Sequence, residues 1–239
     1  MKTVGIIGGL GPLAGAHFYQ RIIELTPSGS DENHVPVRLW SSPEIPSRVN
    51  HLRGRGPSPV PALVRMAQGL VTAGAEFLVI ASSTTHYYYD SIASTVSVPV
   101  LNLLEEVAEA IGKTTMKRIA ILATTPTVEF TLYQSAFAKH ELMPIYPDAV
   151  SQTEIMDVIY AVKSGQSRQE LQEVILSIVR KPWTRSADSV LLACTEIPLI
   201  FPRKIWLDQE GRPLFDATDI LARATIRESL DEGLKGGPQ

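Results

Sequence analysis

The sequence has little that would direct it to a nucleic acid, a membrane or an oxidising compartment. Its 239 residues include one cysteine, so no internal disulfide can form. Lys and Arg total 22 against 25 Asp and Glu, and no long basic run occurs, so the electrostatic signature of nucleic-acid or anionic-membrane binding is absent. The apolar run in MKTVGIIGGLGP is too short for a signal peptide or a spanning helix. We therefore expect a cytoplasmic protein with no nucleic-acid or membrane partner.

Metal-binding patterns are missing as well. The five histidines do not stand at metal-ligand spacings, and a single cysteine cannot form a zinc cluster. The sequence therefore predicts no metal site. The histidines are His17, His34, His51, His86 and His140.

Short runs of Val, Ile and Leu alternate along the chain with helical patterns, which predicts an α/β fold with almost purely parallel sheets. At 44% apolar residues and a mean hydropathy of +0.06, the chain can bury a substantial core. The predicted strands are Val4–Gly8, Val35–Trp40, Phe77–Ala81, Val98–Leu101, Arg118–Ala123, Ser189–Ala193 and Pro213–Phe215. A helix is predicted from Pro12, with Ala14, Phe18, Ile22 and Leu25 on its apolar face. Two more are predicted from the capping boxes Ser151 with Glu154 and Ser167 with Glu170.

The sequence also contains an internal repeat. KTVGIIGGLGP from Lys2 aligns with KRIAILATTPT from Lys117, an offset of 117 − 2 = 115. FLVIASST aligns with SVLLACTE, where Ser82 matches Cys194 at 194 − 82 = 112. Two chance matches in a strand-rich chain are the alternative. The repeat predicts two similar Rossmann-like or flavodoxin-like half-domains, residues 1–100 plus 213–239 and residues 101–212, with the active site in a cleft between them at the carboxyl ends of the strands.

The loop after the first strand contains Gly9, Gly11 and Ala14 in the order of a dinucleotide fingerprint. Pro12, however, has no backbone N–H to offer a pyrophosphate, and the next strand ends in serines instead of an acidic residue that would hold a ribose. A tight turn at Gly9 that lets the backbone approach a small anionic ligand fits the loop better.

Two of the predicted apolar strands are followed by residues whose side chains can donate or accept protons. The first is followed by Ser82, Ser83, Thr84, Thr85 and His86, and the second by Cys194, Thr195 and Glu196. A thiol between a parallel strand and a following helix is expected to have a lowered pKa and to be reactive, whereas a buried structural cysteine is the alternative. Likewise, His86 either serves the site or only packs and donates hydrogen bonds.

The stretch PEIPSRVNHLRGRGPSP is polar, rich in proline and too long for a tight connection. Long ordered loops near strand ends often bind ligands. Arg48, Arg53 or Arg55 could hold a carboxylate through two parallel hydrogen bonds, although a solvated surface loop explains Arg53 and Arg55 better.

Together these segments resemble the cofactor-independent aspartate/glutamate racemase family over nearly the whole chain, from MKTVGIIGGLGP to PLFDATDI. The similar segments are GIIGGLGPLAGAHFY, IPSR, ILATTPT, IYAVKSG and ACTEIPL. The resemblance implies Cys194 as a catalytic residue, Arg48 and Lys163 as ligands of the substrate's side-chain carboxylate, no cofactor, and a homodimer.

The family's first catalytic motif usually reads Cys-Asn-Thr-x-His, whereas this sequence has Ser82, Ser83, Thr84, Thr85 and His86 there. The first catalytic cysteine is thus replaced by serine, as in some other members of the family. The remaining substrate-binding candidates are Ser83, Thr84, Thr125, Thr195, Gly9 and His86. Among them, the hydroxyls of Thr84, Thr125 and Thr195 could hold the α-carboxylate together with backbone N–H groups of the two turns.

Racemisation without pyridoxal phosphate needs one base and one acid on opposite faces of the α-carbon. A Ser82/Cys194 pair predicts asymmetric racemisation of an acidic amino acid, slow in the direction that uses Ser82 as the base, because an alcohol is a far weaker acid than a thiol. Two alternatives stay open: a one-cysteine decarboxylase or isomerase on the same scaffold, and a non-catalytic or substituted binder of acidic amino acids.

Overall fold

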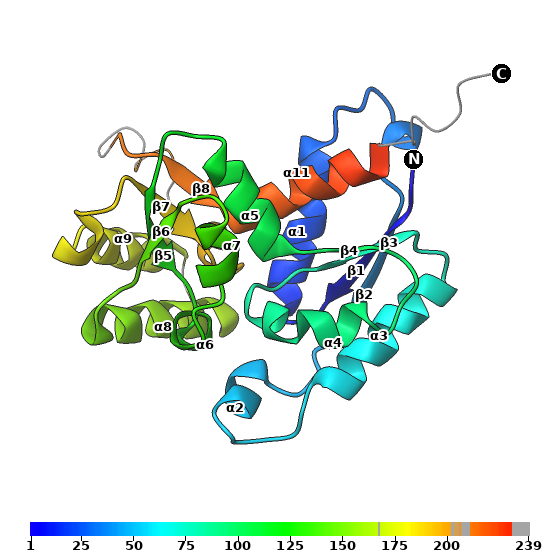
Figure 1. The fold of residues 1–239 in the computed structure, drawn as a ribbon, viewed down its shortest axis with the longest axis horizontal. Helices are drawn as coiled ribbons and strands as arrows, with labels where there is room; N and C mark the ends of the chain where they lie inside the picture. Colours follow the sequence, from blue (N-terminus) through cyan, green and yellow to red (C-terminus); the bar gives the residue numbers. More distant parts are fainter. Residues whose placement is uncertain (167, 202–203, 205, 207–210, 231–239) are drawn as a thin grey trace. The chain divides into compact units, whose positions relative to one another are not determined.

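The computed structural model describes residues 1–166, 168–201, 204, 206 and 211–230, and it divides into two compact units (Figure 1). Unit 1 contains Met1–Ala81, Tyr88–Asn102 and the described residues from Leu221 onward. Unit 2 contains Ser82–Tyr87 and Leu103–Ile220. Each unit is a four-stranded parallel sheet with helices packed against it, as the alternation of strands and helices predicts.

Unit 1 has the strand order β2-β1-β3-β4, and every neighbouring pair is parallel. The strands are β1 (Val4–Gly8), β2 (Val37–Ser41), β3 (Phe77–Ile80) and β4 (Val100–Leu101). The helices are α1 (Pro12–Leu25), η1 (Asp31–Asn33), α2 (Arg48–Leu52), α3 (Val60–Thr72) and α4 (Tyr89–Ala93). Figure 1 shows α1 and α3 on opposite sides of this sheet. On the α3 side, Leu63, Met66 and Leu70 pack with Ile7 and Leu78.

Unit 2 repeats this order as β6-β5-β7-β8, again with parallel neighbours. The strands are β5 (Arg118–Leu122), β6 (Met143–Ile145), β7 (Ser189–Leu192) and β8 (Leu214–Asp216). The helices are α5 (Leu103–Gly112), α6 (Thr125–Glu129), α7 (Gln134–Ala138), α8 (Ala149–Lys163), α9 (Arg168–Val179), η3 (Pro182–Thr184) and η4 (Ile197–Leu199). Two further helices join residues of both units, η2 (Thr84–Tyr88) and α11 (Ala217–Leu230). Leu122 and Leu192 pack against α8 and α9 in the core, where Ile155 and Ile175 are fully buried.

The register of the two sheets confirms the repeat. In unit 1, Val4 is opposite Phe77, and in unit 2 Ile119 is opposite Ser189. These partners differ by 119 − 4 = 115 and 189 − 77 = 112, which are the two offsets that the sequence predicts.

The equivalence extends to the strand ends. The N–H of Ala81 donates to the carbonyl of Ile7 across 3.2 Å, and the N–H of Ala193 donates to the carbonyl of Leu122 across 2.8 Å. Ser82 and Cys194 are the next residues along the chain in the two repeats.

Each of the seven predicted strands coincides with an observed strand to within two residues. The helix from Pro12 is confirmed, and its residues Ala14, Phe18 and Ile22 are buried. Strand β6 was missed, because it lies at the edge of its sheet, contains a proline and buries little.

Two details of the sequence interpretation are corrected. The Ser151–Glu154 capping box is wrong: α8 begins three residues earlier, and the N-cap is Asp148, whose side chain accepts from the N–H of Ser151. The residue Ser167 lies outside the described residues. Residues 213–220 do not return to the first half-domain as expected, because β8 pairs with β7 and the chain rejoins unit 1 only at Leu221.

Candidate active site

Both segments that the sequence singles out belong to unit 2, although residues 82–87 were expected in the first half-domain. Ser82 follows β3 by two positions and Cys194 follows β7 by two positions, and the side chains are 7% and 5% exposed. Apolar strand residues precede both of them, so the polar side chains begin where the buried strand ends. The short helices η2 and η4 follow them.

Ser82 is held by two neighbours on its own turn. The hydroxyl of Thr85 donates to Oγ of Ser82 across 2.9 Å. Nδ1 of His86 lies 2.8 Å from the carbonyl oxygen of Ser82, and Nε2 of His86 accepts from the N–H of Leu103 across 3.0 Å. Since Nε2 is an acceptor, Nδ1 carries the proton and donates. Both ring nitrogens are thus bound to the backbone. His86 therefore fixes this turn, and in this structure it does not offer a nitrogen to a substrate, which was the other role considered for it.

Three threonines form a closed group of hydroxyls beside this turn. Oγ1 of Thr84 lies 2.8 Å from that of Thr124 and 3.2 Å from that of Thr127, and the last two are 3.0 Å apart. All three are buried. The group joins the hydroxyl row to the N-terminus of α6. Thr84 was among the candidate site residues predicted from the sequence. Thr124 and Thr127 were missed, although both belong to the ATTPT segment of the repeat.

Thr125 and Thr195 have separate environments. Oγ1 of Thr125 accepts from Gln152 Nε2 across 3.2 Å, and its N–H donates to the sulfur of Met156 across 3.2 Å. Oγ1 of Thr195 lies 3.4 Å from Oε2 of Glu196. Both hydroxyls therefore have protein partners in this structure.

Cys194 belongs to a chain of three charged or ionisable groups. Its Sγ atom donates to Oε2 of Glu196 across 3.0 Å. The other oxygen of Glu196, Oε1, lies 2.7 Å from Nζ of Lys163, the last residue of α8. The Glu196 side chain is 6% exposed and that of Lys163 is 36% exposed, so the carboxylate is buried while the lysine side chain is partly open to solvent. Glu196 was overlooked as a partner of Cys194, although it is the fourth residue of the ACTE segment.

The environment of Cys194 corrects the expected reactivity of the free thiol. Burial raises its pKa well above the ordinary value, and the charge of Glu196 raises it further; Lys163 lowers the pKa by a smaller amount. The sequence interpretation expected a lowered pKa from a following helix, but the helix after Cys194 is the three-residue η4. The thiol is therefore protonated at rest, and a base must take its proton before it can act as a nucleophile or base.

Two more buried hydroxyls, those of Tyr133 and Ser83, lie close to one another, and Tyr133 also lies near Cys194. The Tyr133 phenol is fully buried, and its pKa is raised first by burial and to a smaller extent by Cys194; the nearby Ser83 hydroxyl lowers it. The hydroxyls of Tyr133 and Ser83 do not meet hydrogen-bond geometry, and neither has a partner among the described residues. Tyr133 was missed in the sequence because the turn before α7, where it lies, carries no motif, whereas Ser83 was named through the resemblance.

Two predicted site residues belong to unit 1. Gly9 has φ of +81°, and a Cβ atom there would lie 2.3 Å from the backbone nitrogen of Ser42. Arg48 starts α2 and donates from Nη2 to the carbonyl of Leu10 across 2.5 Å. The guanidinium therefore lies beside the Gly-rich loop, and its expected role as a carboxylate ligand stays a prediction. Arg53 and Arg55 are exposed, in agreement with a surface loop.

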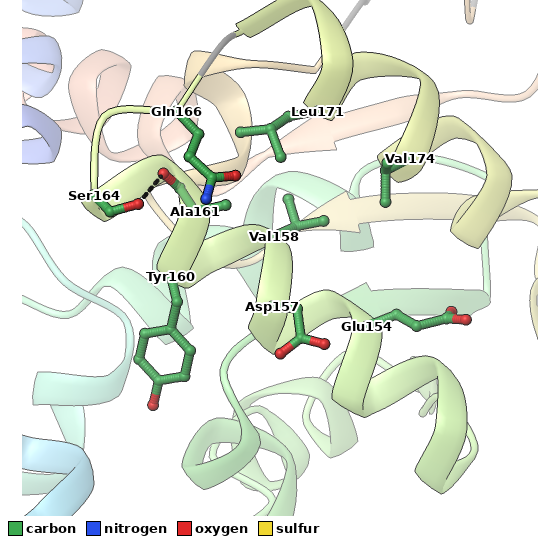
Figure 2. Close-up of a pocket in the computed structure, with 9 residues that line it drawn as sticks. All are labelled: Glu154, Asp157, Val158, Tyr160, Ala161, Ser164, Gln166, Leu171 and Val174. Carbon is green, nitrogen blue, oxygen red and sulfur yellow. Dashed lines mark hydrogen bonds between the residues drawn. The ribbon is translucent and has the colours of Figure 1, made fainter.

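The pocket drawn in Figure 2 is a different feature of unit 2. It has a volume of about 530 Å³ and lies between α8 and α9, where Val158, Leu171 and Val174 line it. None of the predicted site residues lines it. In the described part of the chain no group of three or more His, Cys, Asp and Glu could hold a metal ion. The described helices likewise include none with the length and apolar character needed to cross a membrane.

Comparisons with known proteins show which family and which solved structures this chain is similar to. Residues 7–225 match the model of a family described as Asp/Glu/Hydantoin racemase. The broad specificity amino-acid racemase RacX of Bacillus subtilis (strain 168) is 24% identical over 234 residues, which cover 95% of this chain and 98% of RacX. The solved structure of Picrophilus torridus aspartate racemase superposes with a TM-score of 0.85 at 29% identity, covering 96% of this chain and 94% of that one. A putative Asp/Glu racemase from Yersinia pestis gives 0.80 at 25% identity, with 96% and 100% covered.

Proposed function

Because this chain belongs to the Asp/Glu/hydantoin racemase family, we propose that it is a cofactor-independent racemase of an acidic amino acid, aspartate or glutamate. Cys194 and Ser82 are the proposed pair that moves the α-proton. The observation that carries this proposal is their equivalence: each follows the same strand of the repeated unit by the same number of residues, and each is buried. Racemisation needs one group on each face of the α-carbon, and a duplicated unit supplies such a pair.

The two groups have unequal surroundings, which supports unequal roles. Cys194 has a carboxylate acceptor, Glu196, at 3.0 Å. Oγ of Ser82 accepts from Thr85, so the hydrogen of Ser82 itself remains to be donated. A thiol is by far the stronger acid, so Cys194 takes the α-proton through its thiolate and Ser82 donates or relays a proton from the other face. The enantiomer that presents its α-hydrogen to Cys194 should therefore react faster.

The proposed substrate class rests on cationic side chains and on relatives. Arg48 and Lys163 occupy the positions that the resemblance assigns to the side-chain carboxylate, and a guanidinium suits such a group. Aspartate racemase from Picrophilus torridus supports an acidic substrate, whereas RacX is described as having broad specificity. The buried hydroxyl of Tyr133 near Cys194, with that of Ser83 beside it, supplies further polar groups for a small polar ligand.

A homodimer is also proposed. Strand β2 is an edge strand of its sheet, and its residues Leu39 and Trp40 are 38% and 42% exposed. Exposed apolar side chains on an edge strand favour association with another chain. Light scattering coupled to size exclusion tests this, and a monomer at micromolar concentration contradicts it.

The asymmetry of the site also supports a second candidate function, a one-cysteine decarboxylase or isomerase. A one-cysteine decarboxylase or isomerase needs a single proton donor. Cys194 is the single cysteine of the sequence, and its thiol lies beside the carboxylate of Glu196. Such an enzyme would leave the α-hydrogen of aspartate and glutamate untouched.

The deciding experiment follows hydrogen exchange and inversion in heavy water with each enantiomer of aspartate and glutamate. Exchange accompanied by inversion is expected, with one enantiomer of a pair exchanging faster than the other. Exchange without inversion would mean that Cys194 works from one side only. No exchange with any of the four amino acids would rule out the racemase for these substrates.

A further inference from the structure

The carboxylate of Glu196 occupies an unusual position for a buried acid. It contacts the only cysteine of the sequence through Oε2 and a lysine through Oε1, at 3.0 Å and 2.7 Å. A buried carboxylate is costly unless it is paired, and Lys163 provides that pairing. The pairing alone does not account for the thiol, because sulfur is a weak hydrogen-bond donor and a carboxylate does not need it for burial.

We propose that Glu196 is the group that accepts the proton of the Cys194 thiol, and that Lys163 controls this transfer by exchanging Glu196 for the substrate's side-chain carboxylate. The inference rests on the proposed racemase function. The S–H bond of Cys194 breaks, its electron pair stays on sulfur, and an O–H bond forms at Oε2 of Glu196. The resulting thiolate takes the α-hydrogen of the substrate as a proton and becomes a thiol again.

The protons balance over one turnover. Glu196 then holds one extra proton, and the Ser82 side has given one to the opposite face of the substrate. Return of the proton from Glu196 to the Ser82 side resets the site with no oxidant, reductant or second substrate.

The repeat shows why this base serves one side only. Position 84 is equivalent to position 196, since 196 − 84 = 112, and it holds Thr84, whose hydroxyl is bound to Thr124 and Thr127. Ser82 therefore has a hydroxyl donor, Thr85, where Cys194 has a carboxylate acceptor. The half-site that carries the stronger acid also carries the group that can ionise it.

Lys163 has the position and freedom that a control residue needs. It ends α8, and its side chain is 36% exposed, so the ammonium can turn without breaking the helix. An ammonium beside a carboxylate opposes protonation of that carboxylate. When the side-chain carboxylate of an acidic substrate draws the ammonium away, this opposition is lost and Glu196 can take the thiol proton. Ionisation of Cys194 is thereby coupled to the presence of an acidic substrate.

The test uses the single cysteine as its own reporter. The rate of alkylation by iodoacetamide, measured against pH in the substrate-free protein, reports ionisation of Cys194 alone; α-hydrogen exchange in heavy water reports catalysis. Glu196→Gln removes the negative charge beside the thiol, so alkylation at pH 8 should become several-fold faster. Exchange should fall by roughly 10²-fold, the scale of a lost acid–base group. The groups whose charge acts on this thiol are Glu196 and Lys163, and Tyr133 is a titratable neighbour.

These opposite changes separate proton transfer from a merely structural role. If Glu196→Gln leaves exchange unchanged or speeds it together with alkylation, Glu196 does not accept the proton. If alkylation is also unchanged, the contact with Cys194 is absent in solution. A wild-type protein without exchange but with the alkylation response would instead defeat the proposed function and retain the thiol–carboxylate contact.

Three variants complete the design. Glu196→Asp keeps the charge and shortens the side chain, so exchange should fall while the alkylation profile moves little; this variant serves if Glu196→Gln does not fold. Lys163→Met should reduce the preference for acidic over neutral amino acids in exchange, and an unchanged preference would overturn the control role of Lys163. Glu154→Gln removes another α8 carboxylate paired with a lysine, Lys181, outside the site, and should alter neither measurement.

Discussion

The hydroxyl of Thr85 donates to Oγ of Ser82 across 2.9 Å, and both side chains are buried. A hydroxyl that already accepts a bond from its neighbour is oriented with its own hydrogen directed elsewhere. This geometry supports Ser82 as a proton donor or relay. Among the described residues no carboxylate contacts Ser82, which distinguishes the Ser82 half-site from that of Cys194.

Ser82→Cys should raise the rate of inversion by about tenfold or more relative to the wild type. A thiol at this position is a much stronger acid than the alcohol, and acid–base groups typically contribute 10²–10⁴-fold. Circular dichroism of the substrate measures inversion directly. Ser164→Cys adds a thiol to an exposed position of the same unit and should leave inversion unchanged. An unchanged rate in Ser82→Cys would contradict the paired-site model.

Cys194→Ser should abolish detectable α-hydrogen exchange while leaving the fold intact. The serine hydroxyl retains a donor for the buried carboxylate of Glu196, so no charge is left without its partner. An alcohol cannot supply the base that the reaction requires. Exchange in heavy water and the thermal unfolding midpoint give the two readouts. Residual exchange above one-tenth of the wild-type rate would show that another group takes the proton.

The sequence predicted the sheets well because parallel strands buried on both faces are continuous apolar runs. Strand β6 lies at an edge, contains Pro144 and buries little, so no such run marks it. The cap of α8 was misplaced for a related reason: Ser151 and Glu154 match a capping box in sequence, but Asp148 forms the bond. Local motifs do not show which of two nearby polar residues caps the helix.

The site was predicted in part. Ser82 and Cys194 were found because the repeat offset of 112 equates them, and the sheet register reproduces that offset. The partners of Cys194 could not be found in this way. Lys163 and Cys194 are 31 residues apart in sequence, and only the packing of α8 beside the end of β7 places the ammonium on Glu196. The direction of the thiol's pKa shift depends on that burial, so the sequence expectation had the wrong sign.

Arg48→Lys should raise KM for the acidic substrate several-fold and leave kcat within about a factor of three. The lysine retains one positive charge but cannot form the paired hydrogen bonds of a guanidinium. It also loses the Nη2 bond to the carbonyl of Leu10. Steady-state kinetics with aspartate and with glutamate measure the effect, and Arg53→Lys, on the exposed loop, is the matched control. A fall in kcat at constant KM would argue that Arg48 acts on the chemical step instead.

The stability of the protein should fall on the alkaline side, starting near pH 8.5. Burial raises the pKa of Cys194 in the folded state, so the unfolded chain ionises first, near its ordinary value of about 8.5, and is thereby favoured as pH rises. The contribution is fully present below the unfolded pKa and is lost as pH rises toward the folded pKa. Tyr133 acts in the same direction above about pH 10. Urea unfolding at pH 7.5, 9 and 10 tests this; Cys194→Ala should weaken the first decline, and an identical pH dependence would contradict the assignment.

Gly9→Ala should destabilise unit 1 more than a positive φ alone explains. Gly9 has φ of +81°, and an added Cβ would come within 2.3–2.5 Å of the backbone of Ser42, which cannot move aside as a side-chain tip could. Gly74 is the matched control, since its φ is +89° but the space around it is open. We expect Gly74→Ala to cost roughly 1 kcal/mol for the left-handed backbone and Gly9→Ala at least about 2 kcal/mol, because strain and overlap then add. Urea unfolding of both variants measures the difference, and equal losses would show that the close approach of the loop to Ser42 carries no energetic weight.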